Sequence, residues 1–339
     1  MKALLSVACS GWMLFGAGWA TAGCARVETT PPPSAGSADP LRPAPGEFSV
    51  MTFNLHQYAL IDRDGSADTL EPKPREETAA IIECLRQVSP DILAVQEIGD
   101  PAAWNDFKLR LREAGLGDYL HEEYLRRDPG DRNLAVLSRF PIVARTPRTD
   151  DTYTIGPTQF PVRRGFLEVD IEVSPAYRLR LMVAHLKSKL FHAYGQAEMR
   201  RNEARLLSNH VRASLKENPA INLLVVGDLN DDPSSRPLRE ILFYQDKPIL
   251  RDLRPEDGAG AAWTYRGADD NHQRLDYLLA SDGLLPETVM DKTRVVNFPS
   301  LARASDHRPL VGTFVAAERG AESAPPLTSR PDREFPMDE

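Results

Sequence analysis

The amino-acid sequence predicts a single α/β domain, and three observations support this. From Phe48 onward, segments of strand type alternate with amphipathic helical segments. The run Asn222–Val226 is almost entirely apolar, as expected for a strand buried on both faces of a sheet. No Gly/Ser-rich break or shift of composition divides residues 47–316, so the chain of 339 residues is expected to contain one large domain.

Composition and charge exclude several classes of protein. Hydrophobic residues make up 42% and charged residues 27% of the chain, which is normal for a globular protein. Mean hydropathy is −0.38, and no stretch of about 20 apolar residues occurs beyond the N-terminal region, which excludes a polytopic membrane protein. The net charge of −8 argues against coating nucleic acid by bulk charge, though not against a local basic cleft. Three cysteines exclude a disulfide-rich scaffold.

Residues 1–24 have the pattern of an export signal: one Lys, a mostly apolar stretch and then small residues. Two cleavage sites compete. Ala20-Thr21-Ala22 fits an ordinary signal peptidase, whereas Thr21-Ala22-Gly23-Cys24 resembles a bacterial lipobox in which Cys24 is lipidated. The sequence therefore predicts export, either as a bacterial membrane-anchored lipoprotein or as a free periplasmic or secreted protein.

The segments on either side of residues 47–316 differ from the predicted domain in composition. Residues 25–46 are rich in proline and small residues and are expected to form a disordered, semi-extended linker. Residues 317–339 contain Glu, Ser, Pro and Arg without periodicity, and we expect them to form a disordered tail.

Helices are predicted where apolar residues recur with helical spacing. In the segment 75–88, Ile81, Cys84, Leu85 and Val88 fall on one face at i, i+3, i+4 and i+7, which also predicts a buried, structural Cys84 thiol. The predicted helices are Arg75–Val88, Ala102–Ala114 and Gln196–Lys216.

Strands are predicted where apolar residues alternate with polar ones or form a short continuous run. Gly165–Val173 shows such alternation, and Arg178–Ala184 is its expected antiparallel partner. The other predicted strands are Ser49–Leu55, Asp91–Val95, Leu134–Leu137, Asn222–Val226, Arg274–Ala280 and Leu310–Phe314.

Short polar clusters occur at or just after the ends of these strands, where a rigid sheet presents functional groups. They are Phe53-Asn54-Leu55-His56, Gln96-Glu97, His185-Leu186-Lys187-Ser188, Gly227-Asp228-Leu229-Asn230-Asp231, Arg274-Leu275-Asp276-Tyr277 and Ser305-Asp306-His307. Each cluster alone has an ordinary structural explanation, such as a turn or a helix cap. Together and in this order, they indicate a catalytic site.

The residue types in these clusters favour hydrolysis assisted by a metal ion. Asp228 and Asn230, at i and i+2, can both project from the end of an apolar strand and position a water molecule. Glu97, Asn54 and Asp306 offer the hard oxygen ligands that Mg²⁺ prefers, and no Cys/His set has the spacing of a zinc site.

Two histidines on separate strands could contact a phosphate oxygen or transfer a proton. They are His185 and His307, and Asp276 is a natural hydrogen-bonding partner for one of them.

The order FNLH, QE, HLKS, GDLND, RLDY and SDH resembles the endonuclease/exonuclease/phosphatase superfamily over about residues 47–316. This superfamily includes pancreatic-type DNase, exonuclease-III-type abasic-site endonucleases, inositol polyphosphate 5-phosphatases and bacterial sphingomyelinases. The resemblance implies a four-layer α/β (α+β) sandwich, in which two mixed β-sheets pack face to face and helices lie outside. It also implies a metal-dependent hydrolase that acts on phosphoester bonds.

The resemblance implies a role for each matched residue. Glu97 would be the principal ligand of Mg²⁺, with Mn²⁺ as the alternative cation, and Asn54 and Asp306 would lie nearby in the metal and phosphate site. Asp228 would orient or deprotonate the attacking water, and Asn230 would hold that water or a phosphate oxygen.

The same resemblance assigns the histidines. His307 would stabilise the pentacovalent phosphorane, with Asp276 as its hydrogen-bonded partner, and His185 would bind the scissile phosphate from the other side. His56 stands where abasic-site endonucleases place an acidic residue, which argues against that subfamily.

Other residues are expected to bind phosphate or substrate. Asn133 matches a position that is often polar in the superfamily, and either Arg163 or Arg164 resembles a phosphate-binding arginine. Tyr265 and Trp263 would stack on a base or line the pocket, with core packing as the alternative for Trp263. A basic rim for a polyanion is a further hypothesis, with a solvated helix face as the alternative, and its members are Lys187, Lys189, Arg200, Arg201 and Arg205.

The favoured interpretation is an exported, Mg²⁺-dependent phosphodiesterase of nuclease type. The alternative is a phospholipid or inositol-phosphate hydrolase like the sphingomyelinases, although the sequence reveals no exposed aromatic hairpin of that kind. A catalytically inactive binding module is a remote alternative, because Glu97, Asp228, Asn230, Asp276 and His307 are all present. The expected partners are a phosphoester substrate (nucleic acid, phospholipid or inositol phosphate) and, through an N-terminal lipid, a membrane; the chain is expected to be a monomer.

Overall fold

The computed structural model describes residues 43–327, apart from residues 66–68 and 128–131. The predicted export signal (1–24), most of the predicted linker (25–46) and residues 328–339 therefore lie outside the described residues. Within the described part of the chain, no helix is long and apolar enough to cross a membrane.

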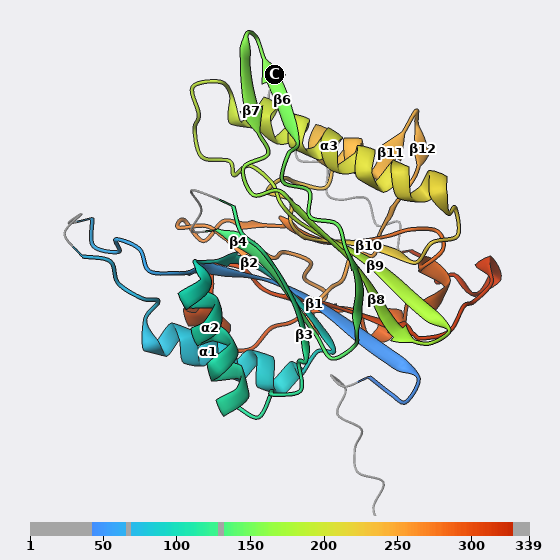
Figure 1. The fold of residues 1–339 in the computed structure, drawn as a ribbon, viewed down its shortest axis with the longest axis horizontal. Coiled ribbons are helices and arrows are strands. Elements are labelled where there is room, and N and C mark those ends of the chain that lie inside the picture. The colour runs from blue at the N-terminus through green and yellow to red at the C-terminus, as the bar shows by residue number, and fades with distance from the viewer. Residues whose placement is uncertain (1–42, 66–68, 128–131, 328–339) are drawn as a thin grey trace, which may run out of the picture. The chain divides into compact units, whose positions relative to one another are not determined.

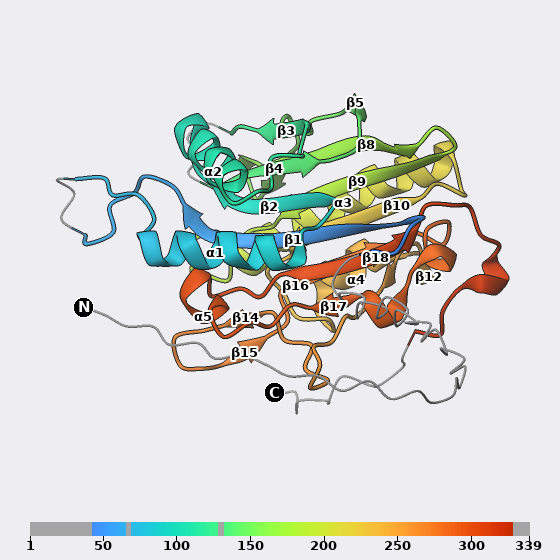
Figure 2. The same cartoon turned by 90° about the horizontal axis from the view of Figure 1, so that it is seen from below.

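The first of two large sheets contains the N-terminal and C-terminal strands of the domain. Its strand order is β17-β18-β1-β2-β4-β3. β1 pairs with β2 in parallel and with β18 antiparallel, so the sheet is mixed. Figure 2 shows β18, β1, β2 and β4 side by side. The strands are β1 (Glu47–Tyr58), β2 (Ile92–Ile98), β3 (His121–Leu125), β4 (Asn133–Ser138), β17 (Arg294–Val295) and β18 (Leu310–Val315).

The second large sheet is built from the middle of the chain in the order β13-β16-β10-β9-β8-β5. β10 pairs with β9 in parallel and with β16 antiparallel. The predicted antiparallel pair is confirmed, since Phe166 lies opposite Ala184. The strands are β5 (Ile142–Arg145), β8 (Phe166–Ser174), β9 (Tyr177–His185), β10 (Leu223–Asp228), β13 (Arg251–Asp252) and β16 (Asp276–Ala280).

Helices cover the outer faces of the two sheets, which confirms the four-layer arrangement. The helices α1 (Arg75–Val88), α2 (Pro101–Glu113) and α5 (Leu301–Ala304) pack on the first sheet, and α3 (Gln196–Glu217) and α4 (Arg236–Leu242) pack on the second. Figure 1 shows α1 and α2 on one side of the sheets and α3 on the other.

Alternation along the strands divides the apolar residues among three cores. In β1, Phe48 and Val50 belong to the core between the sheets, whereas Met51 and Phe53 belong to the core beneath α1 and α2. In β10, the even residues Leu224 and Val226 belong to the core between the sheets, and the odd residues belong to the core beneath α3 and α4. Because side chains alternate across a strand, the residues that continue the inner face of each strand are directed between the two sheets.

The predicted elements agree closely with the observed ones, and the differences are short. The helix predicted at residues 75–88 has those bounds, and the Cys84 thiol is buried as expected. The strand predicted from Arg274 begins at Asp276. The sequence analysis missed β3, β5, β13 and β17, and also three small hairpins, because these segments are short or polar and lie at sheet edges or outside the sheets. The hairpins are β6–β7 (Thr152–Ile155, Thr158–Pro161), β11–β12 (Phe243–Tyr244, Lys247–Pro248) and β14–β15 (Tyr265–Arg266, His272–Gln273).

The first part of the predicted disordered tail, as far as residue 327, is in contact with the domain. Glu318 accepts a hydrogen bond from Asn222 at 2.9 Å, and a short 3₁₀ helix follows at Ala321–Ser323. Leu327 packs against the core between the sheets. Side-chain contacts with the domain hold this segment, and they have no periodic signal in the sequence.

Gly227 in β10 allows the main chain of β9 to approach closely. Its φ is +129°, and a Cβ built there would lie 2.0 Å from the carbonyl oxygen of Ala184. Such a conformation and contact exclude a side chain. The next residue is Asp228, so the close approach also positions that carboxylate.

We expect Gly227→Ala to lower the free energy of unfolding by about 2–4 kcal/mol, because it adds both backbone strain and a clash with a neighbouring strand. Urea unfolding measures this. Gly258→Ala is the matched control, since no atom lies within 4 Å of a Cβ at that position, and its effect should stay within about 0.5 kcal/mol. Equal effects from the two variants would contradict the assigned role of Gly227.

Candidate active site

The predicted catalytic residues meet at one end of the interface between the two sheets. Asn54 continues the inner face of β1, His185 that of β9 and Asp228 that of β10, beyond the last apolar residues. In the sheet register, Asp228 lies beside His185 on one side and beside Asp276 on the other. The strand ends therefore bring together residues from four distant segments of the chain.

Asp228 lies at the centre of this group. Its Oδ2 accepts hydrogen bonds from Asn54 Nδ2 at 3.0 Å and from Asn230 Nδ2 at 3.1 Å, and its Oδ1 accepts from the main-chain N–H of Asn230 at 2.9 Å. His185 Nε2 lies 3.3 Å from the same Oδ2. Asp228 is thus oriented by the first sheet through Asn54 and by the second through His185.

His307 and Asp276 form the predicted pair. His307 Nδ1 lies 2.7 Å from Asp276 Oδ2, and its Nε2 lies 3.8 Å from Asp228 Oδ2. Ser305 holds this loop, because its hydroxyl donates to the Asn54 carbonyl oxygen at 2.8 Å and accepts from the His307 N–H at 3.0 Å. Thr264 Oγ1 accepts the main-chain N–H of Asp276 at 3.0 Å.

Burial and neighbouring charges change the protonation of this group. Burial alone would lower the pKa of His307, but the Asp276 and Asp228 carboxylates raise it to about 10. Burial raises the pKa of Asp228 to about 7; the charge of His307 opposes this rise, while Asp276 and Glu97 add to it. Burial and the nearby Arg164 lower the pKa of His185 well below its usual value. These shifts favour a protonated His307 and a neutral His185 at neutral pH, and they make Asp228 a stronger base than an ordinary carboxylate.

Backbone strain gathers in the same place. Asn230, Glu97 and His56 all have positive φ, at 56°, 59° and 48°, although none of them is glycine. Such left-handed conformations cost free energy and are frequent at functional sites. At Glu97 the strain accompanies a register shift in β2, which turns its side chain out of the normal alternation.

The predicted ligands offer donor atoms that fit a hard divalent cation. Asn54 lies opposite Gln96 in the sheet, so Asn54 and Glu97 come from adjacent strand ends. Glu97 Oε2 accepts the N–H of Gln57 at 3.0 Å, and its Oε1 lies 3.8 Å from His185 Nε2, at the interior of the site. These carboxylate and amide oxygens are ligands that Mg²⁺ prefers.

Among the described residues, a different trio also brings possible metal ligands together. One atom each from Asp228, Asp276 and His307 lie within 4.8 Å of one another. Within this trio, His307 Nδ1 is already paired with Asp276 Oδ2 at 2.7 Å, an arrangement suited to proton transfer. We therefore interpret this trio as the proton-transfer group and keep Glu97, Asn54 and Asp306 as the predicted metal ligands.

The group opens into a cleft of about 440 Å³. Tyr265 lines it and its ring centroid lies 5.0 Å from that of His307, so this residue is placed as predicted. Trp263 lies instead between the Arg308 guanidinium, 3.5 Å from its ring, and the stacked ring of His272 at 4.1 Å. Trp263 is half-buried, belongs to none of the three cores and lines a neighbouring cavity of about 310 Å³, so neither predicted role describes its position. The predicted catalytic and metal-binding residues that line the cleft are Glu97, His185, Asp228, Asn230, Asp306 and His307.

The structure distinguishes between the two candidate arginines. Arg164 is buried and donates to the carbonyl oxygen of Leu186 at 2.7 Å, an oxygen that Asn230 also contacts. Burial lowers the pKa of Arg164, and the charges of Glu203, Glu97 and Asp228 oppose this shift. Arg163 is exposed and contributes a main-chain carbonyl to Arg127. Arg164 is therefore the arginine placed beside the site.

Two other predicted substrate residues lie away from the cleft. The Asn133 side chain donates to the Gly99 carbonyl at 2.9 Å and to the Tyr124 hydroxyl at 3.0 Å. Lys187 directs its ammonium to its own loop, at 3.2 Å from the Ser188 hydroxyl. Neither residue lines the cleft, so their predicted contact with substrate has no support from their positions.

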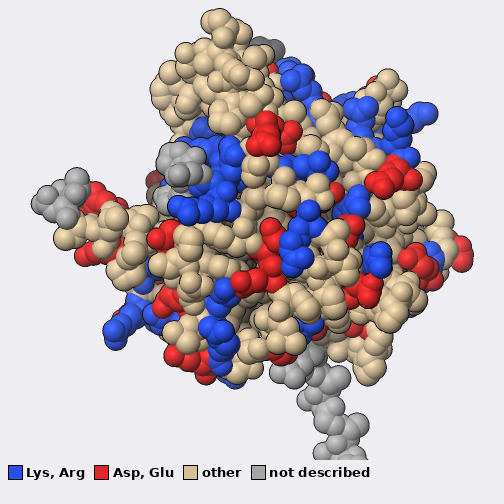
Figure 3. All heavy atoms as spheres, viewed as in Figure 1, with Lys and Arg blue, Asp and Glu red and all other residues tan. Residues whose placement is uncertain are grey.

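The predicted basic rim is largely neutralised by carboxylates. Arg200 is buried against Asp231 at 2.8 Å, Arg201 pairs with Glu240, and Lys189 pairs with Asp232 at 2.7 Å. Lys189 lines the cleft, whereas the arginines lie along α3. Figure 3 shows basic and acidic residues interspersed over most of this face, with a group of Lys and Arg below the β6–β7 hairpin.

Sequence reasoning missed residues that hold the catalytic ones in place. Glu203 in α3 is buried and accepts the N–H of Lys187 at 2.6 Å, which fixes the loop after His185. The Ser305 hydroxyl fixes the main chain of His307 in the same manner, and the Thr264 hydroxyl fixes that of Asp276. Ser305 lay within a recognised cluster, but Glu203 had no local signal because its partner is distant in sequence.

Comparison with known proteins agrees with this fold and site. The chain belongs to the Endonuclease/Exonuclease/phosphatase family, whose model matches residues 51–307. No curated protein sequence matches the chain.

Solved structures similar to this chain share its fold at low sequence identity. The human Nocturnin catalytic domain with bound sulfate has a TM-score of 0.57 and 20% identity, covering 79% of this chain and 94% of that one. Truncated TDP2 from Caenorhabditis elegans has a TM-score of 0.53 and 19% identity, and the match covers 80% of this chain and 98% of that one. Sphingomyelinase C from Streptomyces griseocarneus has a TM-score of 0.52 and 19% identity, and the match covers 79% of this chain and 99% of that one.

We expect Asp276→Asn to lower the pKa of His307, because the variant removes the carboxylate charge that raises this pKa and leaves the effect of burial, which lowers it. In the metal-free wild type, His307 should stay protonated until the pH rises toward about 10. In the variant it should lose its proton at lower pH. NMR titration of the His307 ring measures both, and an unchanged titration would contradict the assigned pair. Asp270→Asn is the control. It removes a carboxylate that lies beside the exposed His272, so the titration of His307 should stay as in the wild type.

Proposed function

We propose that this protein is a Mg²⁺-dependent phosphodiesterase that hydrolyses its substrate by in-line attack of an activated water. The observation that carries the proposal is the buried Asp228 carboxylate, held by Asn54 and Asn230 and flanked by His185 and His307. Family membership supports hydrolysis of a phosphoester bond.

The side chains would divide the reaction between them. Asp228 accepts a proton from the water while the water oxygen forms a bond to phosphorus, and Asn230 holds the water in line. The bond to the leaving alcohol breaks, the leaving oxygen takes a proton from solvent water, and Asp228 afterwards returns its proton to solvent. Protonated His307 stabilises the negative charge on the phosphate oxygens, and Asp276 keeps it protonated. Neutral His185 and buried Arg164 lie on the other side.

Glu97, with Asn54 and Asp306, would hold the cation. A bound Mg²⁺ neutralises charge on the phosphate and orients it. The donor set fits Mg²⁺ and also Mn²⁺, since both prefer oxygen ligands.

We expect Asp228→Asn and His307→Ala each to lower kcat at least about a hundredfold, because each removes a group that acts in the transition state. Hydrolysis of bis-p-nitrophenyl phosphate with Mg²⁺ measures this, and EDTA should abolish the wild-type activity. Both side chains are buried, so the melting temperature of each variant must be compared with that of the wild type. The double variant should lose far less than the product of the single losses. A folded Asp228→Asn variant with wild-type kcat would contradict the mechanism.

A second candidate, phospholipid hydrolysis, is favoured by an apolar loop at the rim of the cleft. Within Ser188–Gly195, Leu190 is 72% exposed and Phe191 is 87% exposed, and Leu190 lines the cleft. The aromatic residues of the nearby hairpin are packed instead, since Tyr153 is buried and Phe160 stacks on it. Turnover of sphingomyelin vesicles in preference to plasmid DNA, with loss of that preference in Phe191→Ser, would establish this alternative.

We propose that the protein is exported and anchored through a lipid on Cys24, on the basis of the Gly23-Cys24 junction in the sequence. Mass spectrometry of the mature protein is expected to find a lipid-modified Cys24 at the N-terminus, and Cys24→Ser should release the protein from membranes. A mature chain that begins at Gly23 would indicate the ordinary signal peptidase instead.

A further inference from the structure

A projecting lobe lies at the rim of the catalytic cleft. It consists of the β6–β7 hairpin (residues 152–161) and the loop of residues 190–195, which follows β9. Aromatic contacts join the two parts, since the Phe160 ring centroid lies 4.9 Å from that of Tyr194. Thr158 Oγ1 also donates to the Tyr194 hydroxyl at 3.3 Å. Figure 1 shows the hairpin projecting beyond α3. The hairpin and the loop therefore form one surface feature.

The surface of the lobe is uncharged and partly apolar. Its two segments contain no Asp, Glu, Lys or Arg, although these residues make up 27% of the whole chain. Phe191 is 87% exposed, and its neighbours Leu190 and Tyr194 are 72% and 46% exposed. In Figure 3 the lobe is the projection at the top, drawn without blue or red side chains. Exposed apolar surface of this kind marks an interaction site, and its partner must offer an apolar environment.

Basic residues lie at the base of the lobe, where its two parts join the domain. Arg163 follows the hairpin and Lys187 precedes the loop. Burial lowers the pKa of Lys187, and the nearby charges of Arg164 and Arg163 lower it further. Arg127 Nε donates to the Arg163 carbonyl oxygen at 3.4 Å. Figure 3 shows Lys and Arg gathered below the hairpin. Within the described part of the chain, none of Arg127, Arg163 and Lys187 forms an ion pair with a carboxylate.

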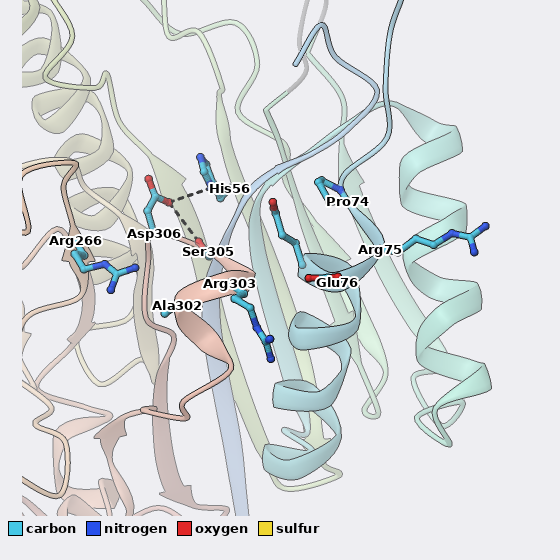
Figure 4. Close-up of a pocket in the computed structure, with 10 residues that line it drawn as sticks. His56, Pro74, Arg75, Glu76, Arg266, Ala302, Arg303, Ser305 and Asp306 are labelled. Carbon is cyan, nitrogen blue, oxygen red and sulfur yellow. Dashed lines mark hydrogen bonds and ion pairs between the residues drawn. The ribbon is translucent and has the colours of Figure 1, made fainter. Parts of the chain in front are cut away.

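The other side of the cleft has a different character. A cavity of about 620 Å³ shares Asp306 with the cleft. Figure 4 shows charged side chains of both signs around this cavity, among them Arg75, Glu76 and Arg266. The combination of exposed apolar side chains with a basic base is therefore a property of the lobe and not of the whole rim.

We propose that the lobe binds the surface of an anionic lipid bilayer, with Leu190 and Phe191 inserted among the lipids and the basic base against the headgroups. Apolar burial and attraction to anionic lipids together drive such interfacial binding. A second copy of the chain fits less well, because a symmetric contact through the lobe would bring two groups of positive charge together. The inference goes beyond the proposed function, since it concerns where the folded domain binds and not which bond it cleaves.

The test measures sedimentation with vesicles of phosphatidylcholine, either pure or mixed with phosphatidylglycerol. The protein carries Cys24→Ser, which removes the proposed lipid, and EDTA withholds the proposed Mg²⁺. We expect tighter binding to the mixed vesicles. Leu190→Ser/Phe191→Ser should weaken this binding at least about tenfold, because both inserted side chains are lost. Arg163→Gln should weaken binding to the mixed vesicles about fivefold, because one charge near the headgroups is lost.

Matched controls separate the lobe from general surface effects. Leu70→Ser/Leu120→Ser removes two apolar side chains that are 67% and 78% exposed but lie before α1 and β3, and it should bind vesicles as the parent protein does. Melting temperatures verify that the variants are folded, as expected for exposed positions.

Three results would overturn the proposal: a parent protein that does not bind the mixed vesicles, a Leu190→Ser/Phe191→Ser variant that binds them equally well, or a dimer in ultracentrifugation that this variant dissociates while vesicle binding is unchanged. The last result would assign the lobe to a contact between two copies. Hydrolysis of bis-p-nitrophenyl phosphate tests the proposed function separately, because vesicle binding in EDTA involves no turnover.

Discussion

The carboxylate of Asp228 lies between two packed sheets, and the rest of the site depends on keeping it there. A buried charge is costly unless hydrogen bonds and opposite charges compensate it. Asn54 and Asn230 donate to it, and His185 and His307 flank it. Each of these groups comes from a different segment. The need to stabilise one carboxylate thus ties the two sheets together at the same point where the chemistry is proposed to occur.

The same burial explains the division of labour between the histidines. His307 faces two carboxylates and is held protonated, whereas His185 is buried near Arg164 and stays neutral. Two residues of one type therefore present a cation and a neutral imidazole on opposite sides of one carboxylate. Opposite shifts of this kind mark sites of acid–base chemistry.

The surroundings of the cleft differ in character from its centre. Leu190 and Phe191 expose apolar surface in the loop at its rim, whereas exposed arginines such as Arg266 line the adjoining cavity. In the proposed mechanism the central residues act only on the phosphate and the water, so the choice among phosphoesters is left to the loops and short elements around the cleft.

The sequence by itself determined the main helices and central strands, because alternation is a local pattern, and its motif order gave the fold class through the family resemblance. It also predicted the residues of the candidate site from the polar strand ends. It placed Asp228 with Asn230 and paired His307 with Asp276. Only the tertiary structure chose Arg164 over Arg163, removed Lys187 and Asn133 from the cleft, and identified Glu203 as a support. Those decisions depend on which groups already have partners across the fold, and hydrogen bonds between distant segments leave no periodic trace in the sequence.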